Sequence, residues 1–305
     1  MLPLMPDPGD ARGGPDRTTL AAFLVMVTIA GGNAVAIRYI SCETCELDPF
    51  WAAATRFLLA ALIFAVIALA LGTGMPHGRA LVGAVLYGAL GFGGAFGFAY
   101  WGFVRVSAGL GGVLLATVPL LTFVFALAHR QERFRWEGLV GGALAVGGIA
   151  VIFGDGIDTG VPLASLVALL AGAACFAEAA IVVKGFPHVH PAAMNAIAMA
   201  VGGAIMLALT AVFDESYVVP RFTSTLAAQA YLVLLGSVVV FALYLFVLRR
   251  WTATAVSYEG VLIPLVAVVL SAWLQDERIT WAFVAGSGLV LMGVYYGALR
   301  RRSIR

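Results

Sequence analysis

The most constraining feature of this 305-residue sequence is a series of long apolar runs, each close to the length that crosses a membrane. A hydrocarbon layer about 30 Å thick takes roughly 20 helical residues to span. A strand of a transmembrane barrel is only about ten residues of alternating polarity, so runs of this length are helices. The sequence therefore predicts an all-α polytopic membrane protein with ten transmembrane helices, over residues 20–37, 49–71, 80–104, 106–128, 138–154, 161–183, 191–213, 226–248, 251–274 and 279–299.

Composition supports the membrane class and excludes others. Hydrophobic residues make up 62% of the chain and charged residues 11%, whereas soluble domains carry about 25% charged residues. The net charge of +2 is too small to indicate nucleic acid as a partner, so the expected partners are the lipid bilayer and a small-molecule substrate. Residues 1–17 are rich in proline, glycine and aspartate, which predicts a disordered tail, and residues 301–305 form a short basic tail.

The basic residues predict the orientation of the chain. If the N-terminus is cytoplasmic, 13 basic residues fall on the cytoplasmic side, 4 on the outer side and 1, Arg56, inside the second span. Positively charged loops stay in the cytoplasm. We therefore expect a multi-pass protein of the inner (plasma) membrane with both termini in the cytoplasm.

An internal repeat relates residues 105–148 to residues 250–293 at a constant offset of 145. The identical pairs include Arg105 and Arg250, Ala108 and Ala253, Pro119-Leu120 and Pro264-Leu265, Glu132-Arg133 and Glu277-Arg278, Trp136 and Trp281, Gly141 and Gly286, Leu144 and Leu289, and Gly148 and Gly293. Each copy contains five spans, over residues 18–154 and 161–300. Because five is odd, the second copy enters the membrane from the opposite face, which predicts a 5+5 inverted repeat.

Inverted repeats are typical of secondary transporters, which bind substrate near the midplane where the two halves meet. Pro119 and Pro264 lie about twelve residues into their spans, near the bilayer centre, where a missing backbone hydrogen bond loosens a helix. These prolines either act as hinges or line a cavity, or they reflect the higher frequency of proline in membrane helices. We expect helices one, three, four, six, eight and nine to line a mostly apolar central cavity.

The repeated motifs resemble the EamA-type module of the drug/metabolite transporter superfamily. The resemblance covers residues 20 to 300 and rests on Pro119, Glu132-Arg133, Gly141 and Gly148, their copies from Pro264 onward, Gly-Gly-Asn-Ala-Val-Ala-Ile-Arg at 31–38 and Ala-Ala-Ala-Thr-Arg-Phe at 52–57. It implies ten helices in a 5+5 inverted arrangement. It also implies export of amino acids, aromatic ones included, other metabolites or toxic compounds.

Two acidic residues lie inside predicted spans, where a charge costs about 2.5 to 3.5 kcal/mol. Glu178 and Glu259 both fall in the cytoplasmic third and could share a site that carries a proton or binds a substrate ammonium. Alternatively, Glu178 belongs to a local network with Lys184 and Glu259 bonds a neighbouring hydroxyl. The family often has glutamate just before the proline of helix nine, where this chain has Ile263.

Two further polar residues, Arg56 and Asn33, also lie within spans. Arg56 is about 10 Å deep at 1.5 Å per residue and matches the arginine of the family's second helix. It is either functional or structural, and a structural Arg56 would snorkel outward or pair with Glu43, Glu46 or Asp48. Asn33 must find hydrogen-bond partners, either on the substrate or on a neighbouring helix.

Aromatic residues supply the remaining candidates for substrate binding. Phe92, Phe96 and Tyr100 recur at four-residue spacing and so form one stripe on a glycine-rich helix. The stripe either walls a cavity or contacts lipid and packs. The substrate-binding candidates are accordingly Asn33, Tyr87, Phe92, Phe96, Trp101, Glu178, Tyr244, Tyr258 and Glu259, with Pro119 and Pro264 as hinges.

Several functions lack their sequence motifs. There is no Walker loop, so energy would come from a gradient or from exchange, with protons a candidate coupling ion. We expect no enzyme activity, no cofactor and no metal site, and we treat Cys42 and Cys45 as features of an outer loop. The preferred function is a secondary transporter that exports amino acids, and also amphipathic drugs, by alternating access; the alternatives are a passive channel and an intramembrane enzyme.

The predicted orientation can be tested by labelling. A single cysteine introduced between residues 130 and 135 should react with a membrane-impermeant maleimide only after the cytoplasmic face is exposed, because that loop carries three arginines. The measurement is labelling of intact cells against inside-out vesicles. Reaction in intact cells would contradict the orientation.

Overall fold

The computed structural model describes residues 16–40, 47–106, 108–154, 161–275 and 280–299. These residues are helical apart from short connections, and no strand occurs among them. Ten helical segments are long and apolar enough to cross a membrane. This confirms the predicted fold class and the ten spans, with ends shifted by a few residues.

In the first half, spans one to five are formed by α1 (Arg17–Arg38), α2 (Pro49–Ala70), α3–η2–α4 (Arg79–Tyr87, Gly88–Gly94, Ala95–Phe103), α5–α6 (Ala108–Leu115, Val118–Ala128) and α7 (Trp136–Phe153). In the second half, spans six to ten are formed by α8 (Leu163–Gly185), α9 (Pro191–Val212), α10–η4–α11 (Thr223–Val233, Leu234–Val239, Val240–Leu248), α12–α13 (Ala253–Ser257, Glu259–Gln275) and α14–η5 (Trp281–Val294, Tyr295–Leu299).

The first helix begins at the last residue of the predicted tail. The Asp16 side chain accepts a hydrogen bond from the backbone N–H of Thr19 at 2.8 Å, which satisfies one of the free donors of the first turn. Residues 1–15, the outer loop with Cys42 and Cys45, and the basic tail lie outside the described residues.

Spans four and nine are each interrupted near the predicted prolines. The ring of a proline clashes with the carbonyl four residues earlier. For Pro119 that residue is Leu115, where α5 ends before α6 begins at Val118. For Pro264 it is Gly260, two residues after the break at Tyr258, and Pro264 itself lies inside α13. Their role as hinges stays a prediction.

Spans three and eight each contain a π-helical segment, a feature that the sequence analysis missed. The segments are Gly88–Gly94 and Leu234–Val239. A π-helical turn bonds each N–H to the carbonyl five residues earlier, is rare, and frequently lies at functional sites. The cluster of glycines in span three was a signal for the first segment, but span eight offers only Gly236.

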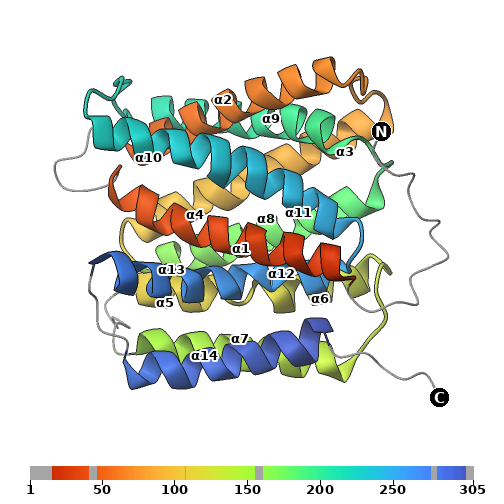
Figure 1. The fold of residues 1–305 in the computed structure, drawn as a ribbon, viewed down its shortest axis with the longest axis vertical. Coiled ribbons are helices and arrows are strands. Elements are labelled where there is room, and N and C mark those ends of the chain that lie inside the picture. Colours follow the sequence, from red (N-terminus) through yellow and green to blue (C-terminus); the bar gives the residue numbers. More distant parts are fainter. Residues whose placement is uncertain (1–15, 41–46, 107, 155–160, 276–279, 300–305) are drawn as a thin grey trace.

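The helices are arranged so that equivalent pairs from the two halves meet (Figure 1). In the figure α2 and α9 lie at the top and α7 and α14 at the bottom, with the other spans between them. Each span of the first half is equivalent to the span five later in the second half. The contact of α4 with α8 (spans three and six) is equivalent to that of α11 with α1 (spans eight and one). The contact of α1 with α13 (spans one and nine) is equivalent to that of α8 with α6 (spans six and four). This is the pattern expected of two halves related by a two-fold axis.

The contact between α7 and α14 is made by glycines of the repeat. A methyl group placed on Gly148 would lie 2.6 Å from the carbonyl oxygen of Gly286, and one on Gly141 would lie 2.7 Å from that of Gly293. The two pairs are equivalent under the 145-residue offset, which relates Gly148 to Gly293 and Gly141 to Gly286. Small residues let membrane helices approach until their backbones touch, so α7 and α14 tie the two halves together.

We predict that the glycines in the contact between α7 and α14 tolerate no added side chain. Gly148→Ala should destabilise the protein by about 1–3 kcal/mol, because the added methyl group meets backbone atoms that cannot move aside. The matched control is Gly147→Ala, since nothing lies within 4 Å of that position, and it should leave stability unchanged or slightly raised. Thermal unfolding in detergent, followed by size-exclusion chromatography, measures both. Equal melting temperatures would contradict the prediction.

Candidate functional site

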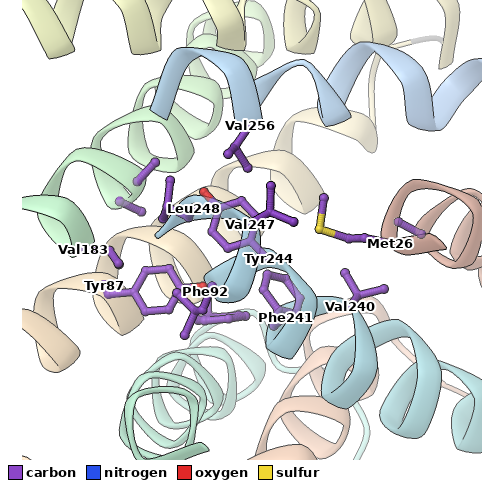
Figure 2. Packing of buried hydrophobic residues seen from close by; sticks show 14 of the residues in the cluster. Met26, Tyr87, Phe92, Val183, Val240, Phe241, Tyr244, Val247, Leu248 and Val256 are labelled. Carbon is purple, nitrogen blue, oxygen red and sulfur yellow. The ribbon is translucent and has the colours of Figure 1, made fainter. Parts of the chain in front are cut away.

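A cluster of aromatic rings fills the interior where the halves meet. Phe92 is fully buried and its ring centroid lies 5.2 Å from Phe57, 5.3 Å from Tyr87 and 4.6 Å from Phe241. These rings come from spans two, three and eight. Figure 2 shows Tyr87, Phe92, Phe241 and Tyr244 gathered at the centre of this packing. The predicted candidates Tyr87, Phe92 and Tyr244 are thus brought together.

The aromatic stripe of span three continues the cluster toward the C-terminal end of α4. Phe96 stacks parallel to Phe92 at 6.4 Å and lies 5.0 Å from Phe57, and Tyr100 follows at 6.0 Å from Phe96. The stripe therefore faces inward, and the lipid-contact alternative is wrong for Phe92. Phe57 packs edge-on against Phe92 and Phe96, and Phe92 in turn contacts Phe241 of the second half. Phe57 was not among the predicted candidates, although it follows Arg56 directly.

Glu259 lies at the edge of this aromatic cluster. It is 5% exposed, begins α13 directly after the break in span nine, and interacts electrostatically with the phenols of Tyr87 and Tyr244. Of the charged residues that the structure describes, only Glu259 and Arg56 are buried. A buried ionisable group within a span is costly and therefore a candidate for function.

Glu178 lies in a different environment from Glu259. Its carboxylate is 3.0 Å from the imidazole Nε2 of His129, and its side chain is 26% exposed. Lys184 does not complete the local network considered for Glu178; it donates instead to the backbone carbonyls of Leu248 and Trp251 at 2.8 and 2.7 Å. The structure thus gives the two acids different partners.

Tyr258 and Trp101 lie outside the aromatic cluster. Tyr258 is fully buried, and its hydroxyl lies in a notch formed by Gly141 and Gly297, where a side chain on either glycine would overlap it. That notch belongs to the contact between spans five and ten. Trp101 is half-buried and lines two hollows, of about 610 and 310 Å³, on the side of spans three and six.

Arg56 is turned into the bundle. It is 3% exposed, and its guanidinium donates to Ser237 Oγ at 2.7 Å and to the carbonyl of Gly236 at 2.9 Å. Both acceptors belong to the π-helical segment of span eight. The expectation that a structural Arg56 snorkels outward is therefore wrong, because acceptors are available inside. Asp48 accepts a hydrogen bond from the backbone of Ser216 instead.

Asn33 lies against the same π-helical segment. Its carboxamide occupies the space that a side chain at Gly236 would fill, and its Oδ1 is buried without a hydrogen-bond partner. Nearby, the hydroxyl of Tyr231 bonds the carbonyl of Ile29 at 2.8 Å, so spans one and eight are held close together. Asn33 and Arg56, from different spans, thus meet at one turn of the eighth.

Polar contacts join the two halves at the end of the bundle that holds residues 129–135, which we call the basic end. Gln131 donates to the carbonyl of Ile181 at 2.9 Å, and Glu132 Oε1 accepts from the backbone N–H of Thr254 at 3.1 Å. The contact of His129 with Glu178 lies in the same region. In the sequence Glu132 stands out only as part of the repeat, since its partner Thr254 lies 122 residues away.

The opposite end has its own contacts between the halves. The Glu215 carboxylate accepts from the backbone N–H groups of Phe50 and Trp51 at 3.2 and 2.9 Å. Burial raises the pKa of Glu215 even though these two hydrogen bonds favour its ionised form. Trp51 Nε1 also donates to the carbonyl of Val218 at 2.7 Å. Polar groups therefore hold the halves together at both ends.

Comparison with protein families agrees with the two-part organisation. The model of the EamA-like transporter family matches twice, over residues 17–154 and 163–297. A solved crystal structure of a protein with 17% sequence identity superposes with a TM-score of 0.79, over 92% of this chain and 96% of that one. That similarity shows a shared fold.

Curated relatives cover most of the chain. A probable terminal-alkyne amino-acid exporter of Streptantibioticus cattleyicolor is 28% identical and aligns over 76% of this chain and 78% of its own. A probable amino-acid metabolite efflux pump of Escherichia coli is 26% identical over 92% and 96%. The uncharacterised inner membrane transporter YedA of Escherichia coli is 27% identical over 81% and 80%.

We predict that the Glu132 contact restrains the basic end. Glu132→Ala leaves the N–H of Thr254 without its partner, which costs about 1–3 kcal/mol when the group is buried, so amide exchange in residues 253–257 should become roughly tenfold faster. Hydrogen–deuterium exchange with mass spectrometry measures this. Glu137→Ala, which removes an acid from the first turn of α7, is the matched control. Unchanged exchange in both variants would exclude the restraint.

Proposed function

The chain belongs to the EamA-like transporter family, and from that premise we propose that it exports amino acids with apolar side chains by alternating access. It is a multi-pass inner-membrane transporter. The amino-acid substrate and the mechanism are our proposal. Two relatives named as exporters of amino acids or their metabolites support the substrate class.

The observation that carries the proposal is the mixed character of the interior between the halves. Among the described residues it combines stacked aromatic rings with one buried acid, Glu259, and one buried base, Arg56. The buried base suits the carboxylate of an amino acid and the rings suit an apolar side chain, while the buried acid is available for a coupling proton. Polyphosphates and sugar phosphates would need several arginine or lysine side chains, which this interior does not supply in the part of the chain described.

Alternating access requires contacts between the halves that can break at one end at a time. The contacts of Gln131 and Glu132 at the basic end and of Glu215 at the other end are few and polar, so either set can open. We infer that the halves are inverted repeats, which the exchange of contacts between equivalent spans supports. The breaks before Pro119 and Pro264 would let span ends move while α7 and α14 stay packed.

The packed interior argues against the passive channel. Tyr87, Phe92 and Tyr244 are at most 2% exposed, so no continuous water path passes through them in this conformation. We propose that Glu259 carries the coupling proton, since it is a buried acid directly after the break in span nine, and that the residues around it move when it is neutralised.

Reconstitution tests the proposal. Proteoliposomes should take up radiolabelled phenylalanine or leucine in a saturable way, faster with a pH gradient or with unlabelled substrate preloaded on the far side. If none of the amino acids tested is taken up, amino acids are not the substrates. Amphipathic drugs would then be tested next. Flux that does not saturate would indicate a channel.

The coupling residue has its own test. We expect Glu259→Gln to abolish the acceleration by a pH gradient while exchange of preloaded substrate persists, because the amide cannot release a proton. Glu178→Gln, at its half-exposed position beside His129, should keep the acceleration. If both variants respond to the gradient like the wild type, neither acid carries the proton.

A further inference from the structure

Arg56 is a buried cation with spare hydrogen-bond donors. A guanidinium has five N–H groups, of which two are used, one on Ser237 Oγ and one on the carbonyl of Gly236. Both acceptors are neutral. Among the described residues, no carboxylate lies within 4 Å of Arg56, and the other three N–H groups have no protein acceptor.

The aromatic neighbours compensate this charge only in part. The guanidinium carbon lies 5.3 Å from the ring centroid of Phe57 and 5.9 Å from that of Phe96. Ring faces attract a cation, but they do not accept the remaining N–H groups. A buried charge without an anion is costly, so an anionic ligand would be bound strongly here. A carboxylate suits the site best, since it accepts two parallel hydrogen bonds from one arginine.

A second unsatisfied group contacts Gly236, the same residue that Arg56 contacts. Asn33 Oδ1 is buried without a partner and contacts Gly236, the residue whose carbonyl takes a hydrogen bond from Arg56. An acceptor next to spare cationic donors matches the two ends of an α-amino-acid headgroup. The π-helical segment of span eight places both side chains, because Gly236 leaves room for the carboxamide and Ser237 fixes the guanidinium.

We propose that Arg56 and Asn33 form the headgroup subsite for the substrate, an inference that rests on the proposed amino-acid transport. Arg56 binds the α-carboxylate, Asn33 Oδ1 accepts from the α-ammonium, and the apolar side chain of the substrate lies along the rings of Phe57 and Phe96. Glu259 is left free for the proton, because it lies in span nine and is not among the partners of Arg56.

The wild-type protein tests the carboxylate subsite without any mutation. Proteoliposomes should take up phenylalanine at least about tenfold more efficiently, by the ratio of Vmax to KM, than its carboxamide, because the amide leaves Arg56 without an anion; tenfold corresponds to about 1.4 kcal/mol. Equal uptake of acid and amide would overturn this subsite while the proposed function stands. Silence for the whole amino-acid panel would overturn both.

Variants assign the discrimination to residues. Arg56→Gln should reduce the preference for phenylalanine over its carboxamide to less than about twofold, mainly through KM, while the control Arg79→Gln, at an exposed helix start, keeps it. Asn33→Ala should lower uptake of phenylalanine about fivefold and leave uptake of 3-phenylpropionate, which has no ammonium, unchanged. Size-exclusion chromatography and thermal unfolding check that each variant folds.

Two results with these variants would contradict the subsite. Retention of the full acid-to-amide preference in folded Arg56→Gln would overturn the role of Arg56. An equal loss of phenylalanine and 3-phenylpropionate uptake in Asn33→Ala would overturn the role of Asn33. If Arg56→Gln does not fold, the wild-type comparison of acid and amide decides the carboxylate subsite alone.

Discussion

Every part of this structure depends on the need to satisfy backbone hydrogen bonds without water. In hydrocarbon a free N–H or C=O costs several kcal/mol, which leaves helices as the only local solution for a chain of this kind. The departures from regular helix are therefore informative. The breaks in spans four and nine and the π-helical segments in spans three and eight all lie on helices that pack inside the bundle, where other groups can replace the lost bonds. Arg56, for example, donates to the carbonyl of Gly236 in the π-helical segment of span eight.

The fold was predictable because its determinants are local or repeated. The lengths of the apolar runs predicted the membrane spans. The repeated prolines and glycines predicted two halves, and the family model matches the chain twice, over residues 17–154 and 163–297. Gly141 and Gly148 then proved to contact the copies of each other, Gly293 and Gly286. The π-helical segment of span eight was not predictable, since apart from Gly236 it resembles any other apolar stretch.

The candidate site was predictable in its residue types more than in its partners. Their positions within predicted spans singled out Glu259 and Asn33. Four-residue spacing singled out Phe92 and Phe96, which the structure brings to the interior. Tyr258 looked the same in sequence but lies in a glycine notch. Direction explains these differences: consecutive positions on a helix point about 100° apart, so Glu259 and its neighbour Tyr258 face different helices. A sequence gives the depth of a residue in the membrane but not the helix it faces.

The asymmetric substrate that we propose needs a place where the two halves differ, and a comparison of span two with span seven identifies one. Both α2 and α9 begin with proline, and the eighth residue of each contacts the π-helical segment of the other half. In α9 that residue is Ala198, whose backbone packs so closely on Gly88 that no side chain fits between them. In α2 it is Arg56, whose long side chain bridges the gap to Gly236 and Ser237 and keeps unused donors there. The contact of Ala198 with Gly88 is therefore closed by backbone packing. The contact of Arg56 with span eight is made by a charged side chain with unused donors, which an anionic ligand can neutralise. The duplicated halves thus share a scaffold and differ at the position where we place the substrate headgroup.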